Sequence, residues 1–167
     1  MFNVSVDISS NDDGLRVAER MMQDLFNTEA LVGIPEEEAA RESGQGITNA
    51  ALMYIHSNGS PLAGIPARPI IEPAIDNSKE RIGAILSDAA KAAMDGSADA
   101  MMAQFEKAGL AGQNAAQAWF TNPANGWEEL KPETVKRKIR KGSTSPKTLI
   151  DTGEFKKSVT YVVRKKS

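Results

Sequence analysis

The sequence predicts an α+β fold in which a small, mostly antiparallel sheet packs with two long helices, joined by an extended proline-rich loop. Apolar residues alternate with polar ones near both ends of the chain, as they do in half-buried strands. Between these ends, residues 74–94 and 98–120 repeat apolar side chains at helical spacing. Residues 58–69 contain three prolines and two glycines, which exclude regular structure there.

The length of 167 residues fits one domain, residues 1–167, with enough chain to bury a core. The chain has no cysteine, so neither a disulfide nor a thiolate metal site is expected. No apolar run approaches the roughly 18 residues of a membrane helix. The N-terminus alternates instead of resembling a signal peptide, so we expect a chain made in the cytoplasm with no membrane association.

The first elements follow from two periodicities. Phe2, Val4, Val6 and Ile8 share one side of a predicted strand. Apolar residues at helical spacing then predict an amphipathic helix over residues 13–26. Its apolar members are Leu15, Ala18, Met21, Met22, Leu25 and Phe26. A short strand is predicted from Ala30 to Ile34, where Pro35 ends it.

The middle of the chain alternates loops and helices. Residues 35–46 are acidic and end in two glycines, which predicts an acidic loop. A short helix over residues 47–56 leads into a Pro/Gly-rich loop over residues 57–73. The helix over 74–94 has the stripe Ile75, Ile82, Ile85, Leu86, Ala89 and Ala93. The helix over 98–120 has the inner face Met101, Met102, Phe105, Ala108 and Trp119, while Gly109 and Gly112 predict a kink or break.

The C-terminal part is predicted to be short and irregular until a last strand. Residues 123–127 form a turn, and Pro132 suits the start of a short basic helix through Arg140. Residues 142–148 have the composition of a flexible hinge. Asp151 or Thr152 is a candidate cap for one helical turn ending at Lys157. The final strand has the alternating residues Val159, Tyr161 and Val163, and we expect it to pair with the two earlier strands.

The two parts of the chain carry opposite charge. Residues 131–167 contain 12 Lys/Arg and 3 acidic residues, whereas residues 1–130 contain 8 Lys/Arg and 19 acidic residues. This asymmetry predicts contact between oppositely charged surfaces, either within the fold or between copies of the chain.

Two patches carry a family resemblance. The first reads His-Ser-Asn-Gly-Ser-Pro from His56 and Ile-Pro-Ala-Arg-Pro-Ile from Ile65. The second runs from Trp127 to Val163, with Leu-x-Pro-x-Thr, a basic run, a Ser/Thr/Pro hinge and Leu-Ile-Asp-Thr-Gly. Their order resembles that of bacteriophage neck and tail-completion (head–tail joining) proteins, of which the Mu-type virion morphogenesis family is the nearest group. With the connecting helices, the resemblance covers about residues 47–163.

The resemblance implies a structural, non-enzymatic virion protein with an α+β fold. Such subunits form a ring in the phage neck, which completes the tail and joins it to the head. A hexamer is favoured, and the implied partners are the tail terminator or tail tube and the head-side connector. Non-specific contact with the DNA in the channel is a further implied interaction. The acidic segment, residues 36–46, has no counterpart in the resemblance.

The candidate interface residues come from both patches. They are Pro61, Ile65, Pro66, Arg68, Pro69, Trp127, Lys136, Arg137, Lys138 and Arg140. Prolines stiffen the loop and reduce the entropy cost of docking. Arg68 is a forked donor that could pair with a carboxylate of a neighbouring subunit or fasten the loop to its own domain. Trp127 has the size and the polar surroundings of an interface anchor.

The basic run from Lys136 to Lys141 has three readings. It could contact phosphates, be a solvated helix face, or meet the acidic surface of an adjacent copy. No aromatic stacking partner or nucleic-acid motif accompanies it, so contact between copies is favoured. A nucleic-acid-binding accessory protein remains the alternative function.

No residue pattern predicts catalysis, a metal or a cofactor. The Asp151-Thr152-Gly153 triplet occurs in aspartic proteases, but the fold and the lysines beside it favour a cap or turn. His56 is the only histidine and cannot form a conventional zinc centre without cysteine; contact with carbonyls at a helix end is expected. Asp95, Ser97 and Asp99 begin like a calcium loop but lack its later ligands, which favours a cap. A small hydrolase is the least supported class.

Overall fold

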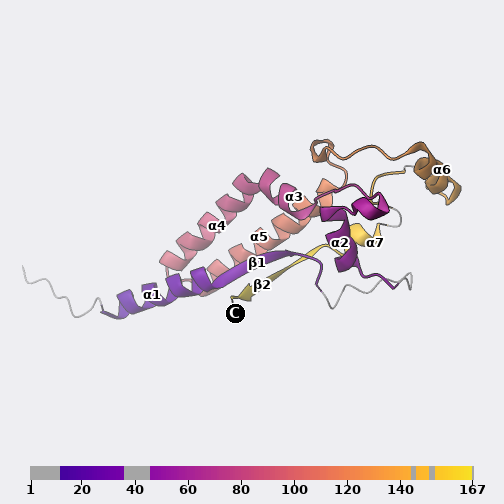
Figure 1. Ribbon diagram of the computed structural model, residues 1–167. Coiled ribbons are helices and arrows are strands. Elements are labelled where there is room, and N and C mark those ends of the chain that lie inside the picture. Colours follow the sequence, from indigo (N-terminus) through magenta and orange to yellow (C-terminus); the bar gives the residue numbers. More distant parts are fainter. Residues whose placement is uncertain (1–11, 36–45, 144–145, 151–152, 167) are drawn as a thin grey trace, which may run out of the picture.

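The computed structural model describes residues 12–35, 46–143, 146–150 and 153–166. The molecule is elongated, with α1 at one end and α6 at the other (Figure 1). The predicted strand over residues 2–8, the acidic segment 36–45, part of the hinge at Thr144 and Ser145, and the candidate caps Asp151 and Thr152 lie outside the described residues.

The described elements are mostly helices. In chain order they are α1 (Asp12–Asn27), β1 (Thr28–Gly33), α2 (Asn49–Asn58), the 3-10 turn Pro61–Ala63, α3 (Ile71–Asn77), α4 (Lys79–Met94), α5 (Ala98–Trp119), the 3-10 turn Pro123–Asn125, α6 (Pro132–Arg140), α7 (Glu154–Lys157) and β2 (Thr160–Lys165). With its small antiparallel sheet among helices, the structure confirms the predicted α+β class.

The sheet pairs a strand near the beginning of the described chain with a strand near its end. β1 and β2 pair antiparallel, with Thr28 opposite Lys165 and Gly33 opposite Thr160. The strands predicted at residues 30–34 and 159–163 are therefore confirmed, with ends shifted by one or two residues. Among the described residues the sheet has these two strands, and the third predicted strand is one of the segments left out.

Helix α5 is the central element, because it packs against both strands, α3 and α4 (Figure 1). Of the kink or break predicted at Gly109 and Gly112, the break is wrong, since α5 is one continuous helix of 22 residues. An added Cβ at Gly109 would lie 2.3 Å from the Tyr161 ring, and one at Gly112 would lie 2.8 Å from Val32. The two glycines let the sheet approach the helix backbone, and tertiary packing outweighs their poor helix propensity.

The single helix predicted over residues 74–94 is wrong in two ways. The structure divides it at Ser78, and the first piece, α3, already begins at Ile71. Pro73 lies in the first turn of α3, where a missing N–H costs no helical hydrogen bond. The Ser78 backbone N–H donates to Ile75 and Asp76, which tightens the last turn and ends α3. The predicted Pro/Gly-rich loop is consequently shorter than residues 57–73.

The core has two main parts. One joins α5 to α3, α7 and the residue before β2, and contains Ile70, Ala74, Ala116, Trp119, Phe120, Phe155 and Val159. The other joins α1, α4 and α5 and contains Met21, Ala89, Ala93, Met101 and Phe105. The predicted inner-face position of Met102 is wrong, as is the stripe position of Leu86, because these side chains are 36% and 37% exposed.

Part of the charge asymmetry is satisfied within the fold. Arg164 of β2 pairs with Glu29 of β1 at 2.9 Å, and Lys165 pairs with Asp24 of α1. The hydrogen bond from Lys165 holds the pKa of Asp24 below its ordinary value. Because both pairs are partly exposed, each contributes little to the free energy of unfolding. They link the end of β2 to β1 and α1.

Candidate functional site: a groove between the proline-rich loop and α6

The proline-rich loop is folded back on the end of α2. Gly59 has φ +74°, and an added Cβ there would lie 2.8 Å from the Ala67 nitrogen. Ser60 and Ile65 form an isolated bridge, and the Arg68 backbone N–H donates to the His56 carbonyl at 2.6 Å. The predicted stiff loop is therefore closed by its own backbone, and glycine is needed where the two ends approach.

A row of aromatic rings brings the two sequence patches together. Trp127 packs edge-on against Phe120, with ring centroids 6.1 Å apart, and Phe120 packs edge-on against Phe155 at 5.5 Å. The next ring is His56, 5.9 Å from Phe155. Such tilted and edge-on contacts are the favoured geometries of aromatic pairs. His56 belongs to the first patch and Phe155 to the second, so the row joins segments about one hundred residues apart.

Between the loop and α6 lies a groove of about 1150 Å³. Its walls are the loop, residues 128–131, one side of α6 and the segment around Leu149 and Phe155. Six of the candidate interface residues line it: Pro61, Ile65, Pro66, Arg68, Arg137 and Lys138. The groove is thus formed by side chains from both patches.

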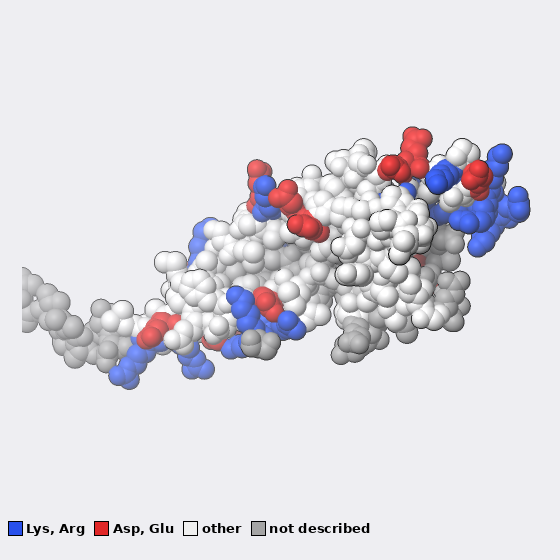
Figure 2. Space-filling view, in the orientation of Figure 1, with Lys and Arg blue, Asp and Glu red and all other residues white. Residues whose placement is uncertain are grey.

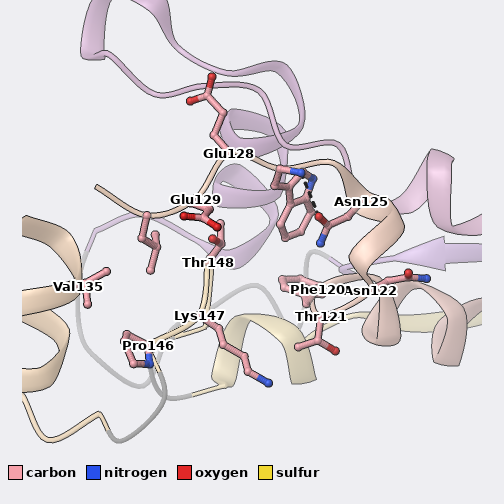
Figure 3. A pocket seen from close by; sticks show the side chains of 12 residues that line it. Phe120, Thr121, Asn122, Asn125, Glu128, Glu129, Val135, Pro146, Lys147 and Thr148 are labelled. Carbon is pink, nitrogen blue, oxygen red and sulfur yellow. Dashed lines mark hydrogen bonds between the residues drawn. The ribbon is translucent and has the colours of Figure 1, made fainter. Parts of the chain in front are cut away.

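The other four candidates lie outside the groove lining. Trp127 borders a smaller neighbouring hollow of about 400 Å³, together with residues of the α5 end and of the segment 146–148 (Figure 3). Its backbone N–H donates to the Asn125 side chain at 3.0 Å, which fixes the turn before it. The Trp127 ring packs on Phe120 and the core. A neighbouring subunit would therefore contact only the part of the ring that stays exposed. Pro69, Lys136 and Arg140 are exposed beside the groove.

The groove contains two polar atoms without partners. The Arg68 Nε and the His56 Nδ1 are buried, and neither atom has a hydrogen-bond partner among the described residues. Burial lowers the pKa of His56 below 6.5, and the charge of nearby Arg68 lowers it further. Within the described ranges no carboxylate forms an ion pair with Arg68, so the intrachain salt bridge considered above is not observed there. The expected contact of the His56 ring with helix-end carbonyls is replaced by its packing on Phe155.

Helix α6 combines an exposed basic face with one structural lysine. Pro132 begins it as predicted, and Lys136, Arg137, Arg140 and Lys141 are exposed. Figure 2 shows Lys and Arg side chains gathered at this end of the molecule, beyond the largely uncharged middle. Lys138 differs, because its Nζ donates to the Lys147 carbonyl at 2.8 Å and to the Ile150 carbonyl. It therefore ties α6 to the segment that precedes α7.

Several groove residues lay outside the sequence prediction. Glu128, Glu129 and Lys131 line the groove between the Trp127 turn and α6, and Phe155 forms part of its floor. The adjacent glutamates add negative charge to a lining that also contains the cations of Arg68 and Arg137. The sequence shows Phe155 as an isolated aromatic residue in a basic segment. It does not show which residues the ring contacts, because these contacts depend on the fold.

Other candidate chemical groups have structural positions. The Ser97 hydroxyl caps α5 by accepting from the Ala100 N–H at 3.3 Å, which confirms the cap reading of the Asp95–Asp99 segment. In the part of the chain that the structure describes, no three His, Cys, Asp or Glu residues gather as a metal-binding group. No helix in these described ranges is long and apolar enough to cross a membrane.

Comparison with known proteins gives no match: no family model, no curated protein and no solved structure is similar to the chain.

Proposed function

We propose that this protein is a non-enzymatic structural subunit of a phage neck, where copies form a ring that completes the tail and joins it to the head. The observation that carries the proposal is the groove. Two motif patches, separated by about sixty residues of helix, contribute its opposite walls. Both are the segments that resemble tail-completion proteins, and an assembly surface would account for their proximity.

The chemistry of the groove suits a protein partner. The stiff loop needs little further ordering on docking, and the partly exposed guanidinium of Arg68, which lines the groove, would donate to a carboxylate of a neighbouring subunit. The basic face of α6 extends this cationic surface at one end of an elongated molecule (Figure 2). Different faces of the two copies would meet, which is the head-to-tail geometry of a closed ring.

A complementation experiment tests the proposal. A phage or prophage with a nonsense codon in this gene should produce DNA-filled heads and tails that remain separate, as seen by electron microscopy. Wild-type protein supplied from a plasmid should restore infectious particles. Arg68→Gln should restore few, whereas Arg81→Gln, an exposed arginine on α4 outside the groove, should restore the wild-type number. A normal titre from the nonsense mutant alone would refute a neck function.

The exposed cations of α6 support a second candidate, a nucleic-acid-binding accessory protein. Contacts to phosphates would give DNA binding that weakens steeply with added salt. Replacing Lys136, Arg137 and Arg140 by alanine would then abolish binding, and Lys138 should be kept because it holds the 147–150 segment. Salt-insensitive or absent DNA binding by the wild-type protein would exclude this candidate and leave the neck proposal intact.

A further inference from the structure

The described residues leave the apolar side chains in the first half of α1 more than half exposed. Leu15 is 62% exposed and Val17 is 52% exposed, and every residue from 13 to 20 is in the exposed class. The helix is amphipathic, and the apolar stripe of such a helix normally faces a core. A helix of this length is marginal in water without packing. The exposed half of α1 therefore has the properties of a surface that is covered in an assembly.

α1 also carries the start of the chain away from its own sheet. The helix passes directly into β1 without a connecting residue, and the two run on from each other (Figure 1). Its 16 residues place Asp12 about 24 Å from the beginning of β1. A fully extended chain from Asp12 reaches about 14 Å by Ile8 and about 21 Å by Val6. By chain length, Val6 and Ile8 consequently cannot reach the beginning of their own β1, so the whole of segment 2–8 does not fit along it.

The sheet offers a place for such a segment. Val32 and Tyr161 face α5, whereas the directly paired Leu31 and Val162 point to the opposite face and are 41% and 44% exposed. The Glu29–Arg164 ion pair lies two residues further along on that same face. Of the described strands, each has one partner, so each leaves one edge unpaired. Two-stranded sheets are marginal alone, and open edges accept an additional strand.

We propose that residues 2–20 are an arm that docks on a second copy of this chain. Segment 2–8 adds a strand to an open edge of the second copy's β1–β2 sheet, and its apolar side extends the surface of Leu31 and Val162. The exposed side of α1 that carries Leu15 is covered in the same contact. A strand at an edge satisfies its backbone hydrogen bonds, which an extended segment lying across a sheet face would not do. This inference rests on the self-association in the proposed function and names the segment that makes it.

The absence of cysteine in the chain allows a direct test by cross-linking. One full-length protein carries Val4→Cys and a second, tagged protein carries Val162→Cys or Leu31→Cys. They are mixed under conditions where native mass spectrometry shows self-association of the wild-type chain, and a short bis-maleimide is added. Each protein carries one cysteine, so a product that contains both proteins must result from a cross-link between two chains. The control acceptor is Gly83→Cys, at an exposed position on α4 with open space around it.

We expect mixed dimers with Val162→Cys or Leu31→Cys and background amounts with Gly83→Cys. The cross-link in a Val4→Cys/Val162→Cys double variant should join chains into a ladder of oligomers. Mixed dimers no more abundant than in the control, or a double variant that cross-links only within one chain, would overturn the arm.

A shortened chain that begins at residue 9 tests the proposed arm separately from the proposed ring. It should keep the thermal unfolding of the full chain but lose its self-association in native mass spectrometry. Normal association of the shortened chain overturns the arm and leaves the ring proposal standing, whereas a full-length chain that never associates, alone or in particles, overturns both.

Discussion

Two residues without side chains control how closely the central helix meets the sheet. Gly109 lies under the Tyr161 ring and Gly112 under Val32, and both glycines are buried. The Tyr161 hydroxyl bonds to Glu106, one turn before Gly109 on α5, and this bond raises the pKa of Tyr161 above its ordinary value. The tyrosine is thus held against α5 at both its ring and its hydroxyl group, and has little freedom to move aside.

Gly109→Ala is therefore expected to destabilise the protein by about 1–3 kcal/mol, because overpacking exceeds the gain in helix propensity. Gly83→Ala is the matched control, since Gly83 is exposed on α4 with nothing near its missing Cβ. It should stabilise by about 0.5–1 kcal/mol. Urea unfolding followed by circular dichroism measures both. A Gly109→Ala variant as stable as the wild type would contradict this description of the helix–sheet contact.

His56 should make stability depend on pH near neutrality. Its pKa is lowered in the folded chain by burial and by Arg68, and the reference value is 6.5. Below pH 6.5 the unfolded chain binds the proton more readily than the folded chain, so stability falls as pH drops toward the folded pKa. Above pH 6.5 the contribution of His56 is constant.

The urea midpoint should consequently decrease between pH 7.5 and pH 5.5 in the wild type. His56→Gln should remove most of this decrease, whatever its effect on stability at pH 7.5. An identical slope in the two proteins would show that His56 is not the responsible group.

At the scale of elements, α6 is attached to the body through Lys138. The Nζ of Lys138 donates to two carbonyls of the segment 147–150, whereas Lys136 on the same helix is exposed. Lys138→Met removes these charge-assisted hydrogen bonds, whose typical contribution is about 1 kcal/mol or more each when shielded from water. Both groups here are partly exposed, so we expect a local effect instead of global unfolding.

Hydrogen exchange measures that local effect. Amides of residues 147–150 should exchange faster in Lys138→Met than in wild type, and Lys136→Met should leave them unchanged. Equal exchange in the two variants would mean that α6 is held by other contacts.

The helices show where sequence reasoning succeeds and where it stops. Period and capping signals located α1, α2, α5 and α6, because these depend on local spacing. The wrong prediction of a break at Gly109 came from applying helix propensity to a residue whose environment is set by Tyr161, about fifty residues away. The division of α3 from α4 at Ser78 depends on how each piece packs on α5, which periodicity does not report.

Some members of the site were predictable from the sequence, but its geometry was not. The loop prolines and the basic helix were recognisable as unusual local sequences, and six of these residues line one groove. The sequence could not indicate that Trp127 would pack on Phe120, or that Lys138 would bond carbonyls, because both depend on contacts across the fold. That these residues contact a neighbouring copy of the chain stays a prediction.

At the scale of the whole molecule, the surfaces proposed for interaction lie at opposite ends. The groove and the basic face of α6 lie at one end, and the exposed half of α1 lies at the other (Figure 1). The arm and the sheet that it is proposed to bind are different surfaces, which favours head-to-tail association, and such association closes into a ring when the rotation between copies allows it.

The most direct test of the central claim is an electron-microscopic reconstruction of the neck of the particle, with the chain located in the density. The account predicts a closed ring of copies between the head-side connector and the tail tube, in which the groove of each copy faces the next. Absence of the chain from purified particles, or its presence as separate copies that do not touch one another, would contradict it.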